Sequence, residues 1–265
     1  MFRKLYNKLL LKYKQIRVIM NENFEKVRFD EIENKIKRTL EVNNICYTDD
    51  IKNKLEIYYN FLVEYNENVN LTSITEKCDV YEKHFLDSIL GVEYFGLNAT
   101  VADIGTGAGF PGVVLKIVRP DLKVYLIDSL QKRVDFLNML IKKLDLSNIY
   151  ALHYRAEDNQ LKEKHLNGFD YVTARAVAKL NTLVEYCLPY VKVGGKFVAY
   201  KSFEANLEAK ECSGVIKLLG GGKCELYTKQ LNGDTNRCFV IIDKIKQTSS
   251  KYPRGQNKPR LAPLK

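Results

Sequence analysis

The sequence predicts an α/β fold: a mostly parallel, seven-stranded sheet with helices on both faces, a C-terminal antiparallel hairpin and an N-terminal helical cap. Three observations predict it. Beyond residue 95, short β-like runs alternate with helix-length segments, and parallel strands require such crossover connections. Four glycines lie within residues 103–112, directly after the first of these runs. Asn232-Gly233, a turn signal, separates the last two runs.

The helical cap is expected over residues 20–95. From Phe24 onward, apolar side chains recur every three or four residues, and this spacing places them on one face of a helix. The pattern includes Phe29, Ile32, Ile36 and Leu40, and later Leu55, Tyr58, Tyr59, Leu62 and Tyr65. The segment is therefore predicted to be helical throughout.

The α/β domain is expected over residues 96–246. Its parallel strands are predicted at Thr100–Ile104, Lys123–Ile127, Ile149–Tyr154, Tyr171–Ala174 and Lys196–Tyr200. Helices are predicted at Gly112–Val118, Gln131–Leu144, Leu180–Leu188 and Phe203–Leu219. The closing hairpin is predicted from Lys223–Gln230 and Arg237–Lys246. Ligands of such sheets bind at the carboxyl ends of the strands, so the residues at those ends are the candidates for function.

The glycine-rich loop, residues 103–112, indicates a nucleotide-type cofactor, because glycine lets a ligand lie against the main chain. A dinucleotide fingerprint that starts with Gly105 and Gly107 would need a third glycine where Phe110 stands. A phosphate-binding P-loop would end in Gly-Lys-Ser or Gly-Lys-Thr, which is absent here. Asp103 suits a cationic ligand better than a pyrophosphate, so S-adenosylmethionine is the expected cofactor. The alternative is a glycine-rich turn without a ligand.

Acidic residues follow the next two strands. Asp128 ends the second strand about twenty residues after the glycine loop, where a carboxylate can accept both hydroxyl groups of a ribose. Ala156 and Glu157 follow the third strand, where a backbone amide and a carboxylate can meet an adenine edge. In each case, the alternative is a solvated polar turn.

Arg175, at the end of the fourth strand, is the candidate for positioning the substrate. The chain lacks the Pro-Pro loop typical of exocyclic amine methylation, and Cys187 does not follow a proline as a carbon-methylating nucleophile usually does. A ring nitrogen such as guanine N7 needs no general base, so alignment and exclusion of water suffice. Arginine pairs with guanine O6 or with phosphate. The alternative is that Arg175 pairs with an acid such as Glu157 or Asp170.

The net charge of +10 is concentrated at the two ends of the chain. Residues 1–19 carry six Lys and Arg, residues 244–265 carry seven, and neither end carries an acid. The net charge of residues 20–243 is therefore about −3 by difference. We expect flexible basic arms that contact RNA phosphate, including a C-terminal tail over residues 247–265. The alternative is that these ends only promote solubility.

The composition also limits the class of protein. No apolar stretch approaches the length of a membrane span. The six cysteines lack Cys-x-x-Cys spacing, which argues against bound metal and against a disulfide framework. We therefore expect a cytoplasmic protein without a metal, and we expect it to be a monomer.

Residues 1–19 form a basic N-terminal extension that allows three interpretations. Phe2, Leu5, Leu9, Tyr13 and Ile16 fall on one helical face, which is compatible with a membrane-surface helix or a packing helix. The third interpretation, which we favour, is an upstream extension before a start at Met20, because the charge balance changes there.

Taken together, the motifs resemble those of the glucose-inhibited division protein B family (GidB, also RsmG), from about Phe61 to the C-terminus. They are Tyr65–Thr72, Lys83–Ser88, Asp103–Gly112, Asp128–Ser129, Arg155–Glu157, Thr173–Ala176, Gly194–Phe197 and Lys251–Arg254. The resemblance implies a Rossmann-like class I S-adenosylmethionine-dependent methyltransferase fold. It also implies methyl transfer to N7 of one guanine near the decoding centre of 16S rRNA, in the small ribosomal subunit.

Carried over residue by residue, the resemblance implies cofactor contacts at Gly105, Phe110, Ala156, Glu157 and Arg175. It likens the segment with His84 and Asp87 to one that bridges the cap and the sheet. Two other functions stay open: a methyltransferase for another RNA, a small molecule or a protein, and a non-catalytic RNA-binding or cell-division factor.

Overall fold

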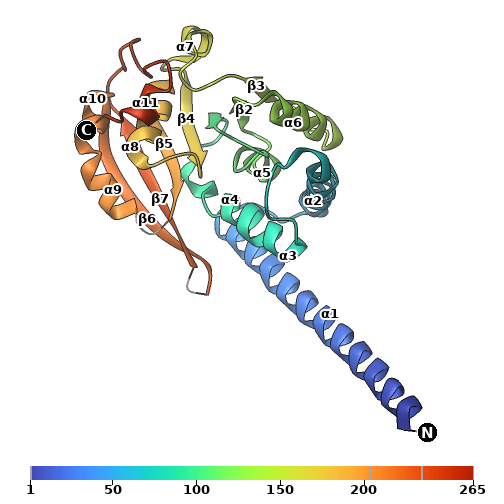
Figure 1. Ribbon diagram of the computed structural model, residues 1–265. Helices are drawn as coiled ribbons and strands as arrows, with labels where there is room; N and C mark the ends of the chain where they lie inside the picture. Colours follow the sequence, from blue (N-terminus) through green and yellow to red (C-terminus); the bar gives the residue numbers. More distant parts are fainter. Residues whose placement is uncertain (1, 203–204, 234, 265) are drawn as a thin grey trace.

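A computed structural model describes residues 2–202, 205–233 and 235–264, without the side chains of residues 2–19, 21 and 22. Seven strands form one sheet in the order β3-β2-β1-β4-β5-β7-β6 (Figure 1). The strands are β1 Thr100–Ile104, β2 Lys123–Asp128, β3 Ile149–His153, β4 Phe169–Arg175, β5 Val191–Lys201, β6 Gly221–Asn232 and β7 Thr235–Lys244. β1 to β5 pair in parallel, and β7 pairs antiparallel with both β5 and β6. This is the predicted mostly parallel, seven-stranded sheet with its antiparallel C-terminal hairpin.

The helices divide into a cap and two layers that cover the sheet. The cap contains α1 Phe2–Val42, α2 Asp49–Val69, α3 Lys77–Val80, the π-helix η1 Tyr81–Leu86, α4 Asp87–Ile89 and the 3-10 helix η2 Val92–Tyr94. The sheet is accompanied by α5 Gly112–Val118, α6 Gln131–Lys143, α7 Asn159–His165, α8 Leu180–Cys187, the 3-10 helix η3 Leu188–Tyr190, α9 Ala205–Glu211, α10 Ser213–Leu218 and α11 Lys258–Leu261.

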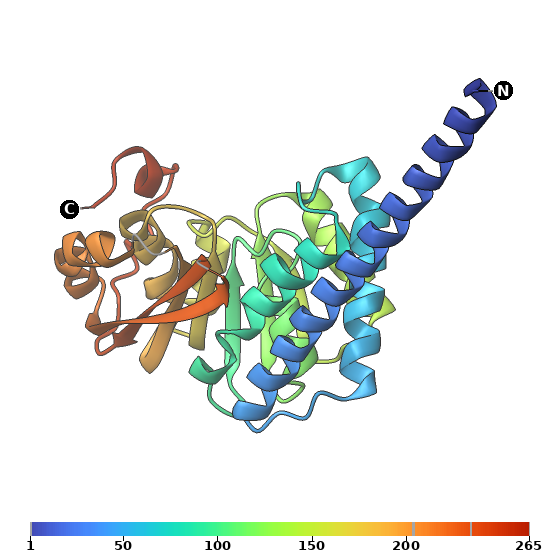
Figure 2. The same cartoon turned by 90° about the horizontal axis from the view of Figure 1, so that it is seen from below.

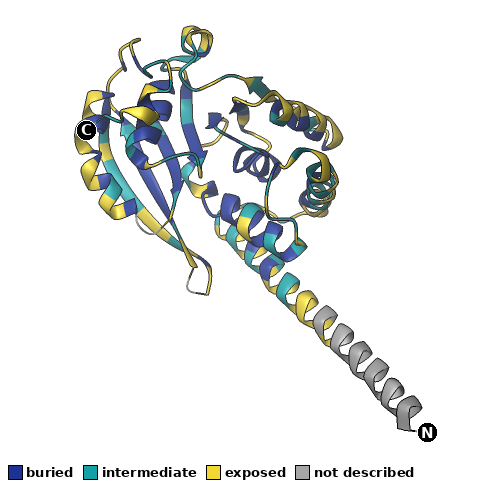
Figure 3. Cartoon of the chain, in the orientation of Figure 1, coloured by how far each residue is buried: buried dark blue, intermediate teal, exposed yellow. Residues whose placement is uncertain are grey.

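Alternation along the strands gives the sheet two apolar faces, because successive side chains of a strand point to opposite sides. Val101 belongs to the hydrophobic cluster that contains the cap, α5 and α6, whereas its neighbour Ala102 belongs to the cluster that contains α8, α9 and α10. Val198 and Ala199 on β5 divide in the same way. The central strands are therefore buried on both faces (Figure 3).

The cap lies on the α5–α6 side of the sheet. α2 packs against α5 and α6, and α4 packs against α5. The C-terminal half of α1 packs on α3, η1 and α4, whereas its N-terminal half extends away from the body (Figures 1 and 2). α1 runs through Met20 without a break. The side-chain pattern expected for residues 1–19 lies outside the described side chains, so its interpretation stays a prediction.

The secondary structure departs from the sequence predictions in three places. The single helix expected over residues 203–219 is two helices, α9 and α10, with 203 and 204 outside the described residues. α7 and α11 were not predicted; they span only seven and four residues, too short to show a clear helical period.

No helix in the described ranges combines the length and apolar character that a bilayer crossing needs.

The C-terminal tail is packed against the sheet domain, so the expectation of a flexible arm is wrong for its described residues. Arg254 donates from Nε and Nη2 to the buried carboxylate of Glu185, over 2.8 and 2.7 Å. Thr182 on α8 donates to the carbonyl of Pro259 over 3.0 Å. Lys244, one of the basic residues counted in this end, is itself buried. Two of the seven cations in residues 244–265, Arg254 of the tail and Lys244 at the end of β7, are therefore committed to internal contacts.

Candidate functional site

The glycine-rich loop leaves β1 and is fastened to the end of β2. The backbone amides of Gly105 and Thr106 donate to the carbonyl of Ile127, over 2.8 and 3.2 Å. The amide of Gly107 donates to the Asp128 carboxylate over 2.9 Å. Gly105 has φ +72°, and a Cβ there would lie 2.7 Å from a methyl group of Val177. Glycine is thus needed at this position both for its backbone angle and for its closeness to the loop after β4.

Asp103 lies beneath this loop with no exposed surface. Its Oδ2 accepts from the Thr106 hydroxyl over 2.7 Å and from the Gly112 amide over 2.8 Å. Its Oδ1 is buried without a hydrogen-bond partner among the described residues. Burial raises the pKa of the Asp103 carboxyl to about 6, although both hydrogen bonds lower it.

A cavity of about 320 Å³ opens at the carboxyl ends of the strands. Its lining includes four of the predicted cofactor residues: Gly105, Asp128, Ala156 and Glu157. They come from the ends of β1 and β2 and from the turn after β3. This is the place where open α/β sheets bind their ligands, and the cavity has the size of a small-molecule site.

The other four predicted residues, Asp103, Gly107, Phe110 and Arg175, are not part of this lining.

Asp128, for which the sequence predicted hydrogen bonds to ribose hydroxyls, already accepts hydrogen bonds within the protein. Its side chain is 2% exposed and accepts from the amides of Gly107 and Leu130 and from Arg133. The Asp128 carboxylate therefore already holds the glycine loop in shape through its hydrogen bond with the Gly107 amide.

The residues present fit S-adenosyl-L-methionine. Two polar atoms at or beside the cavity are buried without a hydrogen-bond partner in the described structure: Nε of Arg133, which lines the cavity, and Oδ1 of Asp103. Buried polar groups are normally paired, so the unpaired Nε of Arg133, a residue of the cavity lining, marks a place where a ligand group can complete the bonding. Glu157, whose side chain is 9% exposed, adds a second carboxylate to the wall.

The cavity wall also contains residues that sequence analysis did not single out. Val177 belongs to the loop after β4, Tyr154 follows β3, and Asn257 and Arg260 belong to the C-terminal tail. The sequence signal for the tail was weak, because its role depends on packing against α8: Asn257 accepts from the Tyr186 hydroxyl over 3.2 Å. The tail thus helps to enclose the cavity.

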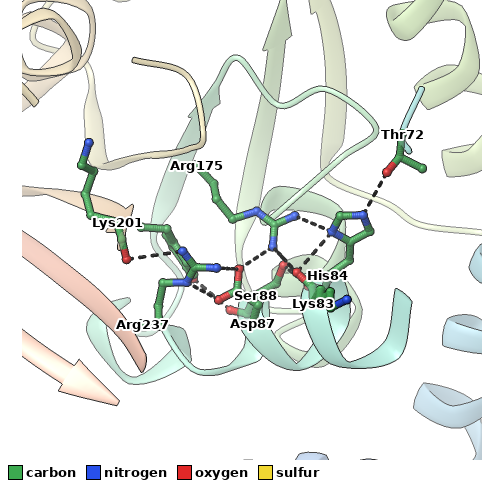
Figure 4. Close-up of polar contacts among 9 residues, drawn as sticks. Thr72, Lys83, His84, Asp87, Ser88, Arg175, Lys201 and Arg237 are labelled. Carbon is green, nitrogen blue, oxygen red and sulfur yellow. Dashed lines mark hydrogen bonds and ion pairs between the residues drawn. The ribbon is translucent and has the colours of Figure 1, made fainter. Parts of the chain in front are cut away.

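Arg175 bridges the sheet and the cap (Figure 4). Its guanidinium donates to Asp87 over 2.7 Å and to the carbonyl of Lys83 over 3.2 Å. Arg237 on β7 also donates to the Asp87 carboxylate, over 2.8 Å from Nη2. Asp87 has no exposed surface. The acids considered from the sequence, Glu157 and Asp170, are not the partners of Arg175.

His84 and Phe110 lie beside this ion pair. The two rings stack with their centroids 4.5 Å apart, and the guanidinium of Arg175 lies 5.1 Å from the Phe110 centroid. Burial and the nearby Arg175 charge lower the pKa of His84 to about 4. His84 is therefore neutral at pH 7 and is held by Thr72 at 3.1 Å. This arrangement supports the expectation of a bridging segment, which the π-helix η1 and the start of α4 supply.

Comparisons with known proteins identify the proteins to which this chain is similar. The family model described as rRNA small subunit methyltransferase G (GidB) matches residues 51–234. A ribosomal RNA small subunit methyltransferase G from Desulforamulus reducens is 49% identical over 212 residues, covering 79% of this chain and 88% of the relative. Its counterpart from Lactobacillus helveticus is 46% identical over 230 residues, which cover 85% of this chain and 96% of the relative. A solved structure of a SAM-dependent methyltransferase from Aquifex aeolicus is 18% identical, covers 65% of this chain and 96% of its own chain, and has a TM-score of 0.47.

Proposed function

This chain belongs to the GidB family, rRNA small subunit methyltransferase G, and on that premise we propose that it methylates N7 of one guanine in 16S rRNA of the small ribosomal subunit. The observation that carries the proposal is the cavity at the strand ends, lined by Gly105, Asp128, Ala156 and Glu157. These are the positions at which the sequence predicted contacts with S-adenosyl-L-methionine.

S-adenosyl-L-methionine, when bound, supplies a methyl group on a sulfonium, which the N7 lone pair takes up while the electron pair of the broken S–C bond stays on sulfur. Guanine gains the positive charge and loses no proton, so the protein needs no general base. The protein's task is to align the base and to exclude water.

Within this proposal, Gly105 and Gly107 shape the loop against which the cofactor lies, and Asp128 fixes that loop through the Gly107 amide. Glu157 and the backbone at Ala156 face the nucleoside side of the cavity. Asp103 places a carboxylate beneath the cationic end of the ligand. Each of these roles is a proposal about a residue in or beside the cavity.

Arg175 is proposed as a positioning residue. Its contacts with Asp87 and Phe110 support a role in fixing the cap against the glycine loop. The variant Arg175→Ala separates the possibilities. Loss of turnover with intact affinity for S-adenosylmethionine, in a protein shown to be folded, would place its role on the RNA side. Parallel loss of cofactor affinity would place it on the cofactor side.

The reaction is tested with purified protein, S-adenosylmethionine and small-subunit RNA from cells that lack this gene. Bare RNA and intact subunits are both offered, and the digested nucleosides are quantified by mass spectrometry. New 7-methylguanosine is the expected product. Methylation at another atom or on another RNA would contradict the proposed position, and absence of methylation in both forms would favour the non-catalytic function.

A further inference from the structure

A patch of aromatic side chains lies on the outer strands of the sheet, beside the cavity. We call it the edge patch; it consists of Lys123, Tyr125, Tyr150, Leu152, Tyr154, Lys164 and His165, which line a hollow of about 240 Å³. Tyr125 on β2 stands opposite Tyr150 on β3 in the strand register, with ring centroids 5.2 Å apart. Alternate residues of β3 supply Tyr150 and Leu152, and Tyr154 follows directly, so they share one face.

This part of the sheet is covered on one side only. α6 packs on β2 and β3 from the cap side. On the opposite side, α8, α9 and α10 pack over the strands from β4 to β6, whereas over the outer strands the seven-residue α7 places His165 beside Tyr125 of β2. β3 is accordingly half-buried or exposed over most of its length (Figure 3), and Tyr150 is 43% exposed. Parallel sheets normally bury both faces, so exposed aromatic side chains here indicate a binding surface.

The charge of the edge patch is positive. The ammonium of Lys123 lies 5.5 and 5.8 Å from the ring centroids of Tyr125 and Tyr150. The ammonium of Lys164 lies 5.8 Å from the ring centroid of Tyr154 and donates to its hydroxyl over 3.3 Å. Among the described residues that line the hollow, none is a carboxylate. Aromatic rings flanked by flexible cations are the combination with which proteins bind unpaired nucleotides.

We propose that the edge patch binds unstacked bases of the RNA substrate, with Tyr150 as the stacking ring and Lys123 and Lys164 as phosphate contacts. The inference rests on the proposed function, because it assigns RNA as the ligand of this surface. Tyr154 lines both the hollow and the cofactor cavity, so the two sites adjoin. Tyr154 lies four residues after Tyr150, about 13 Å along an extended chain, which lets the RNA run from the patch towards the reacting base.

The first test uses fluorescence, because the chain contains no tryptophan. Tyr150→Trp keeps an aromatic ring and makes it the single indole reporter. Addition of single-stranded RNA of about twelve nucleotides, a length in the range such surfaces bind, is expected to quench its emission. The matched control is Tyr227→Trp on β6, since Tyr227 is 42% exposed and lies outside the patch. Heparin, a polyanion without bases, should bind the lysines and leave the emission of Tyr150→Trp unquenched.

The second test measures affinity. Tyr150→Ala is expected to weaken binding of the same RNA by roughly 5- to 150-fold, the range for loss of one stacked base. Tyr227→Ala should leave it unchanged, and Lys164→Ala should reduce the slope of log affinity against log salt by about 0.7. Circular dichroism and affinity for S-adenosylmethionine, measured in parallel, would identify a variant that fails to fold.

The outcomes separate this inference from the proposed function. If wild-type protein methylates small-subunit RNA, yet Tyr150→Ala binds and methylates RNA like Tyr227→Ala, the edge patch is not an RNA site. If Tyr150 controls RNA affinity and no methylation occurs, the patch stands and the proposed reaction fails. If Tyr150→Ala instead abolishes self-association and leaves RNA affinity intact, the patch is a protein interface and the inference is overturned.

Discussion

The guanidinium of Arg175 and the carboxylate of Asp87 form an ion pair 2.7 Å long between the end of β4 and the start of α4. The two residues are 88 positions apart, and the contact fixes the helical cap on the sheet. Because Arg237 donates to the same carboxylate from β7, one buried acid connects three parts of the fold (Figure 4). The cap is therefore held at the edge of the cofactor loop by a charge network as well as by apolar packing.

Asp87→Asn is expected to destabilise the protein by about 3–5 kcal/mol, the usual cost of breaking a buried ion pair from one side. The substitution keeps the side-chain volume but leaves Arg175 and Arg237 without their shared anion. Urea unfolding followed by circular dichroism measures the change. The control is Asp79→Asn, whose side chain is 27% exposed and pairs with Arg28 and Lys83, so about 0–1 kcal/mol is expected. Equal effects of the two substitutions would contradict the proposed importance of the Asp87 network.

Gly105→Ala is expected to destabilise the protein by about 2–4 kcal/mol and to weaken cofactor binding. A left-handed backbone angle costs a non-glycine residue about 1–2 kcal/mol, and overpacking against Val177 adds a similar amount. Gly107→Ala is the matched control. Gly107 has φ +61°, and a Cβ at this position would meet no described atom within 4 Å, so only the backbone cost of about 1–2 kcal/mol is expected.

The contribution of the clash can be isolated in a Val177→Ala background. With the valine methyl groups removed, Gly105→Ala should cost only as much as Gly107→Ala, and the double-mutant cycle should give a coupling of about 1–2 kcal/mol. Chemical denaturation provides the four free energies. A coupling near zero would show that Val177 moves aside without cost, and the steric explanation would then be wrong.

The fold was largely predictable from the sequence, because its signals are local. β1 and α5 were predicted with their observed ends, since a buried apolar run and a glycine-rich turn mark them. The hairpin of β6 and β7 followed from Asn232-Gly233. The helix expected over residues 203–219 is divided in two at Cys212, directly before Ser213-Gly214, a local turn signal that the helical periodicity outweighed in the prediction.

The site was predictable only where residues are close in sequence to a strand end. Gly105, Asp128, Ala156 and Glu157 line the cavity because the parallel sheet brings the ends of its strands together. The pairing of Arg175 with Asp87 depends on how the cap docks, and no short-range pattern encodes it. The inward packing of the tail was missed for the same reason: its charges suggested an arm, and only the fold provides Glu185 as their partner.

Affinity for S-adenosylmethionine is expected to fall as the pH falls through about 6. At low pH the Asp103 carboxyl is protonated, because burial raises its pKa to about 6, whereas a cationic ligand favours the ionised form. The loss should approach tenfold per pH unit at most. Calorimetry between pH 5 and pH 8 measures it. S-adenosylhomocysteine, which lacks the sulfonium charge, should show a smaller change, and Asp103→Asn should show none. An identical pH dependence in Asp103→Asn would exclude Asp103 as its source.

The same raised pKa has a defined effect on stability. The folded protein holds the Asp103 proton more tightly than the unfolded chain, whose carboxyl has the ordinary pKa of 3.8. Its stabilising contribution is therefore complete below pH 3.8 and is lost as the pH rises through about 6. The free energy of unfolding of Asp103→Asn, which has no such proton, should rise relative to wild type between these two pH values. A difference in unfolding free energy that stays constant with pH would indicate that the pKa of the Asp103 carboxyl is not shifted.

Arg254→Ala distinguishes a packed C-terminal tail from a free basic arm. The Glu185 side chain is fully buried and accepts from Arg254 at both carboxylate oxygens. The substitution leaves this buried carboxylate without its partner and should therefore lower the free energy of unfolding by about 3–5 kcal/mol. Detachment of the tail should also make the Arg260–Leu261 bond more susceptible to trypsin. Lys251→Ala, which removes an exposed cation of the same segment, should leave both the stability and the rate of cleavage after Arg260 unchanged. A free arm would give the opposite pattern: both substitutions would lower RNA affinity alike, and neither would alter the unfolding free energy.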